Sequence, residues 1–340
     1  MNTFGRKFRV SIFGESHGAA VGVCIDGCPA GLPLREGDFT ADLLRRKSGA
    51  RGTTPRAESD VPEIISGVFE GRTTGAPITI IFRNENTRSG DYANLLATPR
   101  PGHADFTAAK KFGGFADYRG GGHFSGRITL GLTAAGVVAK KVVSGVKIAA
   151  TILEVGGVKY GEHAAALENA IAAGDSLGGV VECVASNIPA GLGEPFFDSV
   201  ESLISHAVFA IPAVRAVEFG SGFASARQMG SEHNDLIINE LGKTATNNAG
   251  GVNGGISNGN DLVFRAAVKP TASISKPQQT FNFEKKAVDS LTVQGRHDAC
   301  IALRVPVVLE AVTAMVLADL RVVQLSVDHA TGDVRIRNND

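Results

Sequence analysis

The sequence predicts an α+β fold with antiparallel sheets, because strand and helix patterns do not alternate regularly as they do around a parallel sheet. Alternating apolar and polar residues indicate hairpin-like strand pairs near residues 8 to 25 and 63 to 83. Apolar residues at helical spacing indicate long helices near 127 to 145, 198 to 210 and 305 to 320. The chain has 340 residues, 43% of them apolar, which is enough for one large domain or two smaller ones with a well-filled core.

The first strand pair encloses a turn that carries chemically useful side chains. Residues 14–18 place Glu15, Ser16 and His17 between two glycines. We therefore expect His17 at the tip of a hairpin, where a side chain is presented rather than buried. The alternative is that Ser16 and His17 only hydrogen-bond the turn itself.

Glycine-rich segments precede three of the later elements. Residues 119–127 run into the first long helix, whose start is a candidate anion site. Residues 247–257 lack periodicity and lead into a strand around Val263, which is typical of a long functional loop. Residues 295–300 precede the last helix, whose first turn suits Pro306. These segments do not match the dinucleotide or phosphate-loop fingerprints.

Composition argues against a nucleic-acid partner. Lys plus Arg and Asp plus Glu are equal at 34 each, so overall charge does not attract a polyanion. Aromatic residues make up 6% of the chain and Trp is absent, which leaves few platforms on which bases could stack. An RNA-binding module is therefore disfavoured.

Cationic residues gather where the glycines do, with few acidic residues between them. Arg51 and Arg56 lie in a loop rich in Gly, Thr and Pro, where no helix face needs charge for solubility. Because the planar guanidinium suits carboxylate and phosphate, these residues predict a small polyanionic ligand. The alternative for Arg45, Arg46 and Lys47 is a solvated helix face.

Cysteine usage and hydropathy indicate a cytoplasmic protein without a membrane partner. The four cysteines lack metal-binding spacing, so we expect reduced thiols and no metal site. The apolar stretch near the end is interrupted by Glu310, Asp319 and Arg321, and the sequence does not open on a charged-then-apolar leader.

Seven motifs, in order over nearly the whole chain, resemble the chorismate synthase family. They are residues 14–18 with 26–27, 100–105, 117–122, 125–127, 248–251, 269–271 and 295–298. The resemblance implies one domain over residues 1–340, with a helical layer sandwiched between antiparallel β-sheets and assembly as a homotetramer. It also implies a carbon-oxygen lyase at the end of the shikimate pathway, which precedes aromatic amino acid biosynthesis. Such an enzyme converts 5-enolpyruvylshikimate 3-phosphate to chorismate and phosphate by 1,4-trans elimination.

The family requires reduced FMN although the reaction has no net redox change. The sequence has neither the insertions of relatives that reduce their own flavin nor a dinucleotide turn, so we expect a monofunctional enzyme. NADPH would then act only indirectly, through a separate flavin reductase. A flavin oxidoreductase would use the same glycine-rich features, but it also needs a hydride-donor site, which the sequence does not indicate.

The resemblance assigns roles to residues at the matched positions. His17 matches the histidine near the substrate phosphate, and His103 matches the histidine beside the flavin. Asp298 matches the aspartate thought to help flavin N5 take the C6 proton, a task that favours an apolar or flavin-covered site. We expect the neighbouring His297 only to orient its loop.

Arginines are carried over as ligands of the substrate or the flavin phosphate, with Arg56 a lesser candidate. They are Arg46, Arg51, Arg100, Arg127 and Arg296. Flavin contacts are carried over onto a second set. They are His123, Phe124, Ser125, Ala213, Gly254, Lys269, Pro270, Thr271, Ala272, Ser273 and Arg296. The chain departs from the family pattern at His123-Phe124 and at Pro212, which puts side-chain contacts there in doubt.

Overall fold

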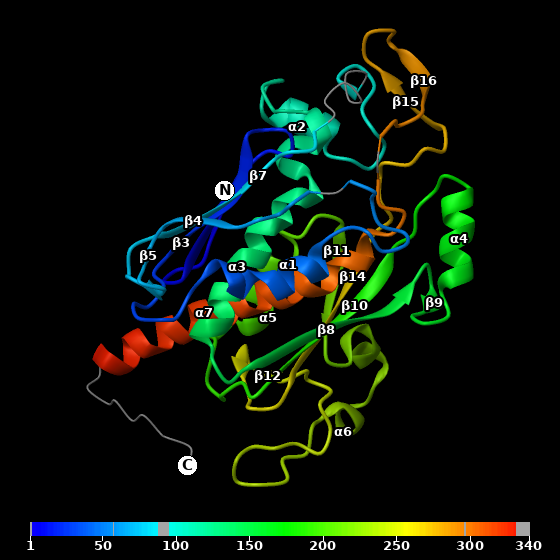
Figure 1. The fold of residues 1–340 in the computed structure, drawn as a ribbon. Helices are drawn as coiled ribbons and strands as arrows, with labels where there is room; N and C mark the ends of the chain where they lie inside the picture. The colour runs from blue at the N-terminus through cyan, green and yellow to red at the C-terminus, as the bar shows by residue number, and fades with distance from the viewer. Residues whose placement is uncertain (1, 57, 88–94, 296, 331–340) are drawn as a thin grey trace.

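A helical layer lies between two five-stranded antiparallel sheets in the computed structural model, which describes residues 2–56, 58–87, 95–295 and 297–330 (Figure 1). The predicted α+β class and the sandwich arrangement are both confirmed. The hairpin near residues 8 to 25 and the antiparallel pair near 63 to 83 are also present.

The first sheet has the strand order β1-β2-β3-β7-β4. Its strands are β1 (Thr3–Phe4), β2 (Arg9–Gly14), β3 (Ala20–Asp26), β4 (Glu63–Ser66) and β7 (Ile78–Arg83). Val21, Val23 and Ile25 alternate along β3 and are fully buried, so the period-2 pattern directs one face of the sheet to the core. The turn between β2 and β3 carries His17, as predicted.

The second sheet has the order β11-β14-β10-β8-β9. Its strands are β8 (Lys147–Val155), β9 (Val158–Lys159), β10 (Gly179–Ser186), β11 (Val214–Phe219) and β14 (Leu262–Val268). Val181, Cys183 and Ala185 on β10 face the helices, next to Phe264 and Ala266 of β14. The strand expected around Val263 is therefore a central strand of this sheet.

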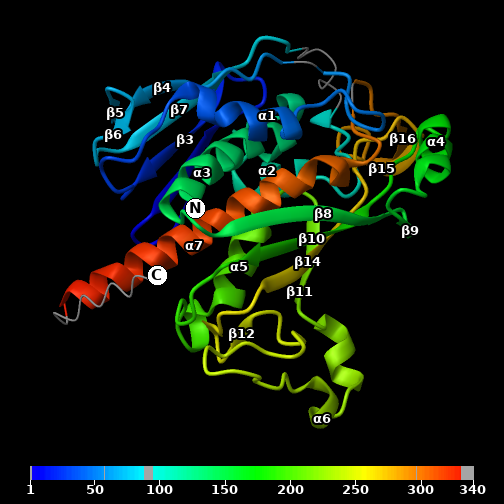
Figure 2. The same ribbon diagram turned by 60° about the horizontal axis from the view of Figure 1, so that its bottom comes forward.

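The helical layer contains α1 (Thr40–Arg46), α3 (Thr129–Val142), α5 (Val200–Val208) and α7 (Val305–Ala330). Helix α3 packs on the first sheet, α7 packs on the second sheet, and the two helices pack on each other (Figure 2). A Cβ at Gly136 of α3 would lie 2.4 Å from the Cα of Ala311 in α7. Glycine at this position thus lets the two backbones approach closely.

Helix α7 is buried despite two acidic residues. Glu310 accepts hydrogen bonds from the Arg45 guanidinium at 2.6 and 2.7 Å and from the backbone N–H of Ala150 at 3.0 Å. Asp319 accepts backbone N–H groups from Arg6, Lys7 and Phe8. Residues 301–326 are long and apolar enough to cross a membrane, but 78% of the most apolar window is buried inside the protein. The segment is a core helix that ties the amino terminus to the helical layer.

Shorter elements decorate the rim of the sandwich. They are α2 (Asp105–Lys111), α4 (Ala164–Ala172), α6 (Gly230–His233), the strand pairs β5 (Val68–Phe69) with β6 (Arg72–Thr73), β12 (Val252–Asn253) with β13 (Ile256–Ser257), and β15 (Gln278–Asn282) with β16 (Ala287–Leu291), and the 3₁₀ turns 36–39, 119–124, 126–128, 196–198, 222–227 and 301–304. All four cysteines are free thiols, as expected.

Candidate active site

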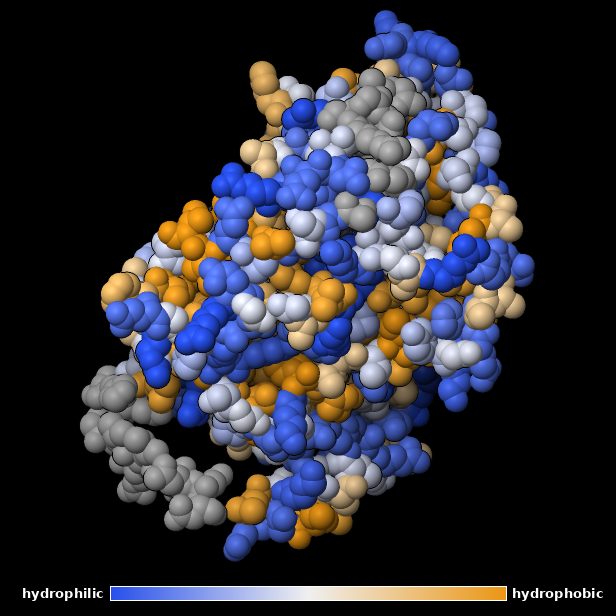
Figure 3. Space-filling model, viewed as in Figure 1, coloured by the Kyte–Doolittle hydropathy of each residue, from blue (hydrophilic) through white to orange (hydrophobic). Residues whose placement is uncertain are grey.

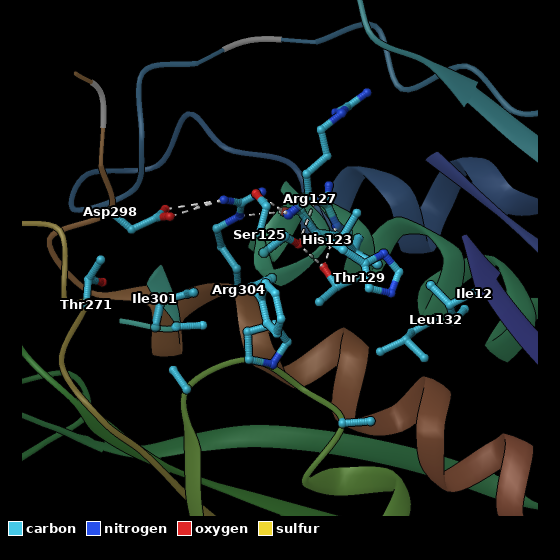
Figure 4. Close-up of a pocket in the computed structure, with 18 of the residues that line it drawn as sticks. Ile12, His123, Ser125, Arg127, Thr129, Leu132, Thr271, Asp298, Ile301 and Arg304 are labelled. Carbon is cyan, nitrogen blue, oxygen red and sulfur yellow. Dashed lines mark hydrogen bonds and ion pairs between the residues drawn. The ribbon is translucent and has the colours of Figure 1, made fainter. Parts of the chain in front are cut away.

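A cavity of about 670 Å³ opens where loops from both halves of the chain meet the ends of the helices. Its walls come from β1 and β2, the loop after α1, the glycine-rich turn before α3, the segment after α5, residues 269–273 and the start of α7 (Figure 4). Segments separated by more than 250 positions in the sequence therefore share one hollow.

Most of the predicted site residues line this cavity. They are Arg46, Arg100, His103, His123, Phe124, Ser125, Arg127, Ala213, Lys269, Pro270, Thr271, Ala272, Ser273 and Asp298. The structure thus collects the proposed catalytic, substrate and flavin positions in one place, while their individual roles stay predictions.

Three predicted positions do not line the cavity. Arg51 is 67% exposed and pairs with Glu168 at 2.5 Å on the surface, because its loop directs the guanidinium outward. Gly254 lies in the tight turn between β12 and β13 with open space around it. His17 lies just beside the cavity and is described below. Arg296 falls outside the described residues.

The buried guanidinium of Arg46 lies among like charges. Burial, followed by the neighbouring charge of Arg304, lowers the pKa of Arg46 to about 9, and the Asp60 carboxylate opposes this shift. The side chain is 3% exposed, so the predicted alternative of a solvated helix face is wrong for this residue. Arg45 instead turns toward Glu310 on the other side of α1.

His103 and Arg100 share one carboxylate, that of Asp105. Oδ1 of Asp105 lies 2.6 Å from Nδ1 of His103 and 2.7 Å from Nη2 of Arg100. Burial raises the pKa of Asp105, but hydrogen bonds from Arg100 and His103 outweigh it, so that the pKa is well below its usual range. A charged acceptor at Nδ1 fixes the ring orientation and leaves Nε2 for a ligand. Nη1 of Arg100 donates to Ser273 Oγ at 2.8 Å.

His17 packs against the glycine-rich turn. A Cβ at Gly120 would lie 2.5 Å from the imidazole, and Gly120 has a φ of +60°, so this turn requires glycine. Burial, together with the positive charges of Arg56 and Arg119, lowers the pKa of His17 below 6.5. The imidazole is therefore neutral at pH 7 until an anion arrives.

Asp298 and Arg304 both line the cavity, and their charged groups face each other (Figure 4). Its two carboxylate oxygens lie 3.3 and 3.4 Å from Nη1 of Arg304, and Oδ1 also accepts the backbone N–H of Thr54 at 2.9 Å. The apolar surroundings expected for this carboxylate are thus replaced by polar ones. His297 lies next to it, with Nε2 2.9 Å from the carbonyl of Gln294, in keeping with a role in the loop.

The predicted flavin positions supply several polar groups and one strained backbone. Thr271 lines the cavity, and its buried Oγ1 has no hydrogen-bond partner among the residues that the structure describes. Ala213 has a φ of +74°, an unfavourable value for a residue with a Cβ, and its carbonyl accepts the N–H of Lys269 at 2.9 Å. His123 lies 2.8 Å from the Gly14 carbonyl through Nδ1, so its ring fixes β2 as well as lining the cavity.

Sequence reasoning missed several charged lining residues. Glu58 accepts hydrogen bonds from Arg56 at 2.6 and 2.9 Å, and Asp60 accepts from Arg46 and Arg127. The expectation that few acidic residues interleave with the arginines is therefore wrong here. The available signal was the two acidic residues, Glu58 and Asp60, that directly follow Arg56 at every second position. Arg215 and Arg304 also line the cavity but lie outside the matched motifs.

Comparisons with known proteins agree on one family. The family model of chorismate synthase matches residues 8–322. A chorismate synthase of Chitinophaga pinensis is 64% identical over 325 residues, covering 95% of this chain and 97% of that protein. A chorismate synthase of Dehalococcoides mccartyi is 47% identical over 349 residues, covering 94% and 96%. A crystal structure of chorismate synthase superposes with a TM-score of 0.71 at 28% identity, covering 95% of this chain and 93% of that one. The chain therefore belongs to the chorismate synthase family, whose members are carbon-oxygen lyases that act on a phosphate.

Proposed function

We propose that this protein converts 5-enolpyruvylshikimate 3-phosphate to chorismate and inorganic phosphate by 1,4-trans elimination, with reduced FMN bound beside the substrate. The observation that carries the proposal is the cationic cavity, which gathers Arg46, Arg100 and Arg127 around the same space as His103 and Asp298.

The cationic lining matches the charge of the proposed substrate. This molecule carries two carboxylates and a phosphate, and bringing it out of water without fixed partners costs several kcal/mol or more per ion. Guanidinium groups offer paired donors to carboxylate and phosphate and keep their charge when partly buried. We assign the anionic groups of the substrate to these arginines.

The residues around the cavity fit a flavin. The Oγ1 atom of Thr271 lacks a partner within the described residues, and buried polar atoms of this kind normally have one. Lys269, Ser125 and Ser273 supply further polar groups around it. When bound, reduced FMN would supply the electron-rich ring that the elimination needs without net oxidation of the product. We place its binding residues at 123–125, Ala213 and 269–273.

The protein side chains then handle the phosphate and the proton. The C3–O bond breaks and phosphate leaves, while C6 loses a proton and the ring gains a second double bond. Arginine side chains stabilise the negative charge of the departing phosphate, and His17 hydrogen-bonds or protonates it. Asp298 assists removal of the proton from C6, which reduced FMN would accept when bound, and Arg304 holds the Asp298 carboxylate in place. His103 balances negative charge beside the ring through Nε2.

We further propose a cytoplasmic, monofunctional homotetramer of a single domain, which depends on an outside reductant for its flavin. Exposed apolar side chains on the segment around α6 support self-association. In the space-filling view, orange side chains are visible at the end of the molecule where α6 lies (Figure 3). Leu236, Ile237 and Leu241, on the segment after α6, are each exposed.

An anaerobic assay tests the proposed reaction. The protein is mixed with the enolpyruvyl substrate and dithionite-reduced FMN, and phosphate release is compared with chorismate absorbance. We expect equal amounts of the two products and no turnover with oxidised FMN. Phosphate release without chorismate would contradict the proposal. NADPH-driven flavin reduction by the pure protein would contradict the monofunctional part of it.

A further inference from the structure

Asp60 lies between two arginines of the cavity. Its Oδ1 accepts Nη1 of Arg127 at 2.8 Å, and its Oδ2 accepts Nη1 of Arg46 at 3.3 Å. All three side chains are nearly inaccessible to water, with Asp60 6% exposed. One carboxylate therefore bridges a guanidinium at the end of α1 and another in the turn before α3.

The other hydrogen bonds of the two guanidinium groups go to uncharged acceptors. Arg127 donates to the side-chain oxygen of Asn84 and to the carbonyl of Arg83 at 3.0 Å. Arg46 donates to Thr129 Oγ1 at 3.0 Å and to the carbonyl of Gly126 at 3.4 Å. Asp60 is thus the carboxylate that both groups share.

Glu58 is a second carboxylate near Arg46 and Arg127, but it does not bridge the two guanidinium groups as Asp60 does. Its Oε2 lies 4.0 Å from Nη2 of Arg127, and its hydrogen bonds go to Arg56 and to the backbone N–H groups of Glu85 and Asn86. The two cations would repel each other in this dry site, and the shared Asp60 carboxylate offsets that repulsion.

The backbone of Asp60 is in a conformation that glycine adopts more easily. Its φ is +53°, a value that L-residues other than Asn and Asp rarely take. Glycine would satisfy this turn at lower conformational cost, so the backbone alone does not explain the residue. Strain retained beside a ligand cavity points to a task for the side chain.

We propose that Asp60 is a positioning residue for the anion site, which holds Arg46 and Arg127 in the arrangement that receives an anionic group of the substrate. The inference rests on the proposed function. The triad keeps a net positive charge, so it still attracts an anion. Because the two guanidiniums are already fixed, the substrate does not bear the cost of ordering them.

Three substitutions test the inference. Asp60→Gly removes the carboxylate and relieves the backbone, Asp60→Ala removes the carboxylate only, and Asp60→Asn tolerates the positive φ and keeps one acceptor oxygen. We expect kcat/KM to fall about 100-fold in the Gly and Ala variants, the size of loss that a small misplacement of binding groups causes. The Asn variant should lie between these and the wild type.

The melting temperature separates a positioning role from a structural one. A positioning role predicts a low kcat/KM in Asp60→Asn at an unchanged melting temperature. Wild-type kcat/KM in Asp60→Gly would overturn the inference, and so would wild-type kcat/KM in Asp60→Asn if the other variants fail to fold.

Failure of the proposed reaction is distinguishable from failure of this inference. A wild-type protein that makes no chorismate contradicts the proposed function alone. The same variants are then compared by calorimetry for their affinity for inorganic phosphate, with FMN present. Weaker phosphate binding in Asp60→Gly and Asp60→Asn supports the positioning role, and equal affinity in all forms overturns it.

Discussion

Paired charges around the cavity orient side chains more than they stabilise the fold. Asp105 fixes Arg100 and His103, and Glu58 fixes Arg56, each at hydrogen-bond distance. Buried ion pairs contribute little net stability because desolvation of both ions offsets their attraction. Their benefit is geometric, since a fixed donor that meets a developing charge needs no reorganisation during the reaction.

We expect Asp298→Ala to lower turnover by at least 100-fold while the affinity for FMN changes little. The reason is that we assign this carboxylate to proton transfer and not to cofactor binding. Turnover is measured anaerobically, and flavin affinity by fluorescence titration. Asp289→Ala is the matched control, since Asp289 lies on β16, pairs with Lys285 and does not line the cavity. Unchanged turnover in Asp298→Ala would remove this residue from the mechanism.

Substrate binding should be coupled to protonation of His17. Burial, Arg56 and Arg119 hold its pKa below 6.5, so the imidazole is neutral at pH 7 before substrate binds. A bound phosphate favours the charged form and raises the pKa, so His17 takes up a proton on binding and affinity falls as pH rises between the two pKa values. Calorimetry in buffers of different ionisation enthalpy measures the protons taken up.

His17→Gln removes this uptake, whereas the control His163→Gln, which alters a half-buried ring stacked on Tyr160 outside the cavity, should not. Because the substrate phosphate also titrates near pH 6, the informative quantity is the difference between wild type and His17→Gln. Equal proton uptake in both proteins would contradict the coupling.

Close packing of α3 on α7 is the contact on which the helical layer depends. Gly136 and Ala311 are the small residues that bring the two backbones together. Each helix also supports one sheet, so their separation sets the spacing of both sheets. The cavity opens at the end of the α3–α7 pair, so the separation of these helices also determines the distance between the cavity walls.

Gly136→Ala should destabilise the protein by about 1–3 kcal/mol, because the added methyl group overlaps the Ala311 backbone and a packed core relaxes little. Chemical denaturation measures the free energy of unfolding. Gly37→Ala is the control, since a Cβ at Gly37 meets nothing within 4 Å and the expected change is within about 0.5 kcal/mol. Equal stability of the two variants would show that α3 and α7 shift apart at little cost.

Local periodicity predicted the strand pairs of the first sheet and the three long helices, but not β8, β10 and β11 of the second sheet. Both strand pairs and all three long helices lie where apolar spacing placed them, because one buried face leaves a mark on adjacent residues. The last helix extends to Ala330, ten residues beyond the expected end. Arg321 and the acidic residues before it break the apolar run, and the partners that accommodate Glu310 and Asp319 are far away in the sequence.

The sequence identified site residues within the matched motifs but missed the residues that hold those side chains in position. Asp60 and Arg304 contact their neighbours through hydrogen bonds that depend on the complete fold. Arg51 resembles the other arginines as a residue type, and only the direction of its loop places it on the surface. Residue type and spacing thus identify candidates, whereas tertiary contacts decide which of them converge.

At the scale of the whole molecule, a neutral charge balance and exposed apolar side chains favour association with copies of itself. Phe196 and Phe197 are almost fully exposed, as is Leu241 on the segment after α6. Large apolar side chains exposed to this degree are candidates for interaction sites. Equal numbers of acidic and basic residues do not oppose assembly by mutual repulsion.

Light scattering should give four times the chain mass of 35.3 kDa. Ile237→Glu combined with Leu241→Glu should lower the measured mass, because charges at a buried contact are left without partners. Lys285→Glu, at an exposed site on a polar hairpin, should leave the mass unchanged. A wild-type mass of one or two chains would contradict the tetramer.

The hydrogen bonds from the backbone amides of residues 6–8 to Asp319 connect parts of the chain more than 300 positions apart. During translation the first strands leave the ribosome long before Asp319 is synthesised, so the Phe8 amide lacks this acceptor until 311 further residues have been added. Helix α7 is translated after the strands of both sheets, and its packing completes the core between them. Nascent chains that stop short of α7 therefore expose the inner face of the second sheet and the side of α3 that α7 covers, and chaperones that bind apolar segments are expected to retain them until release.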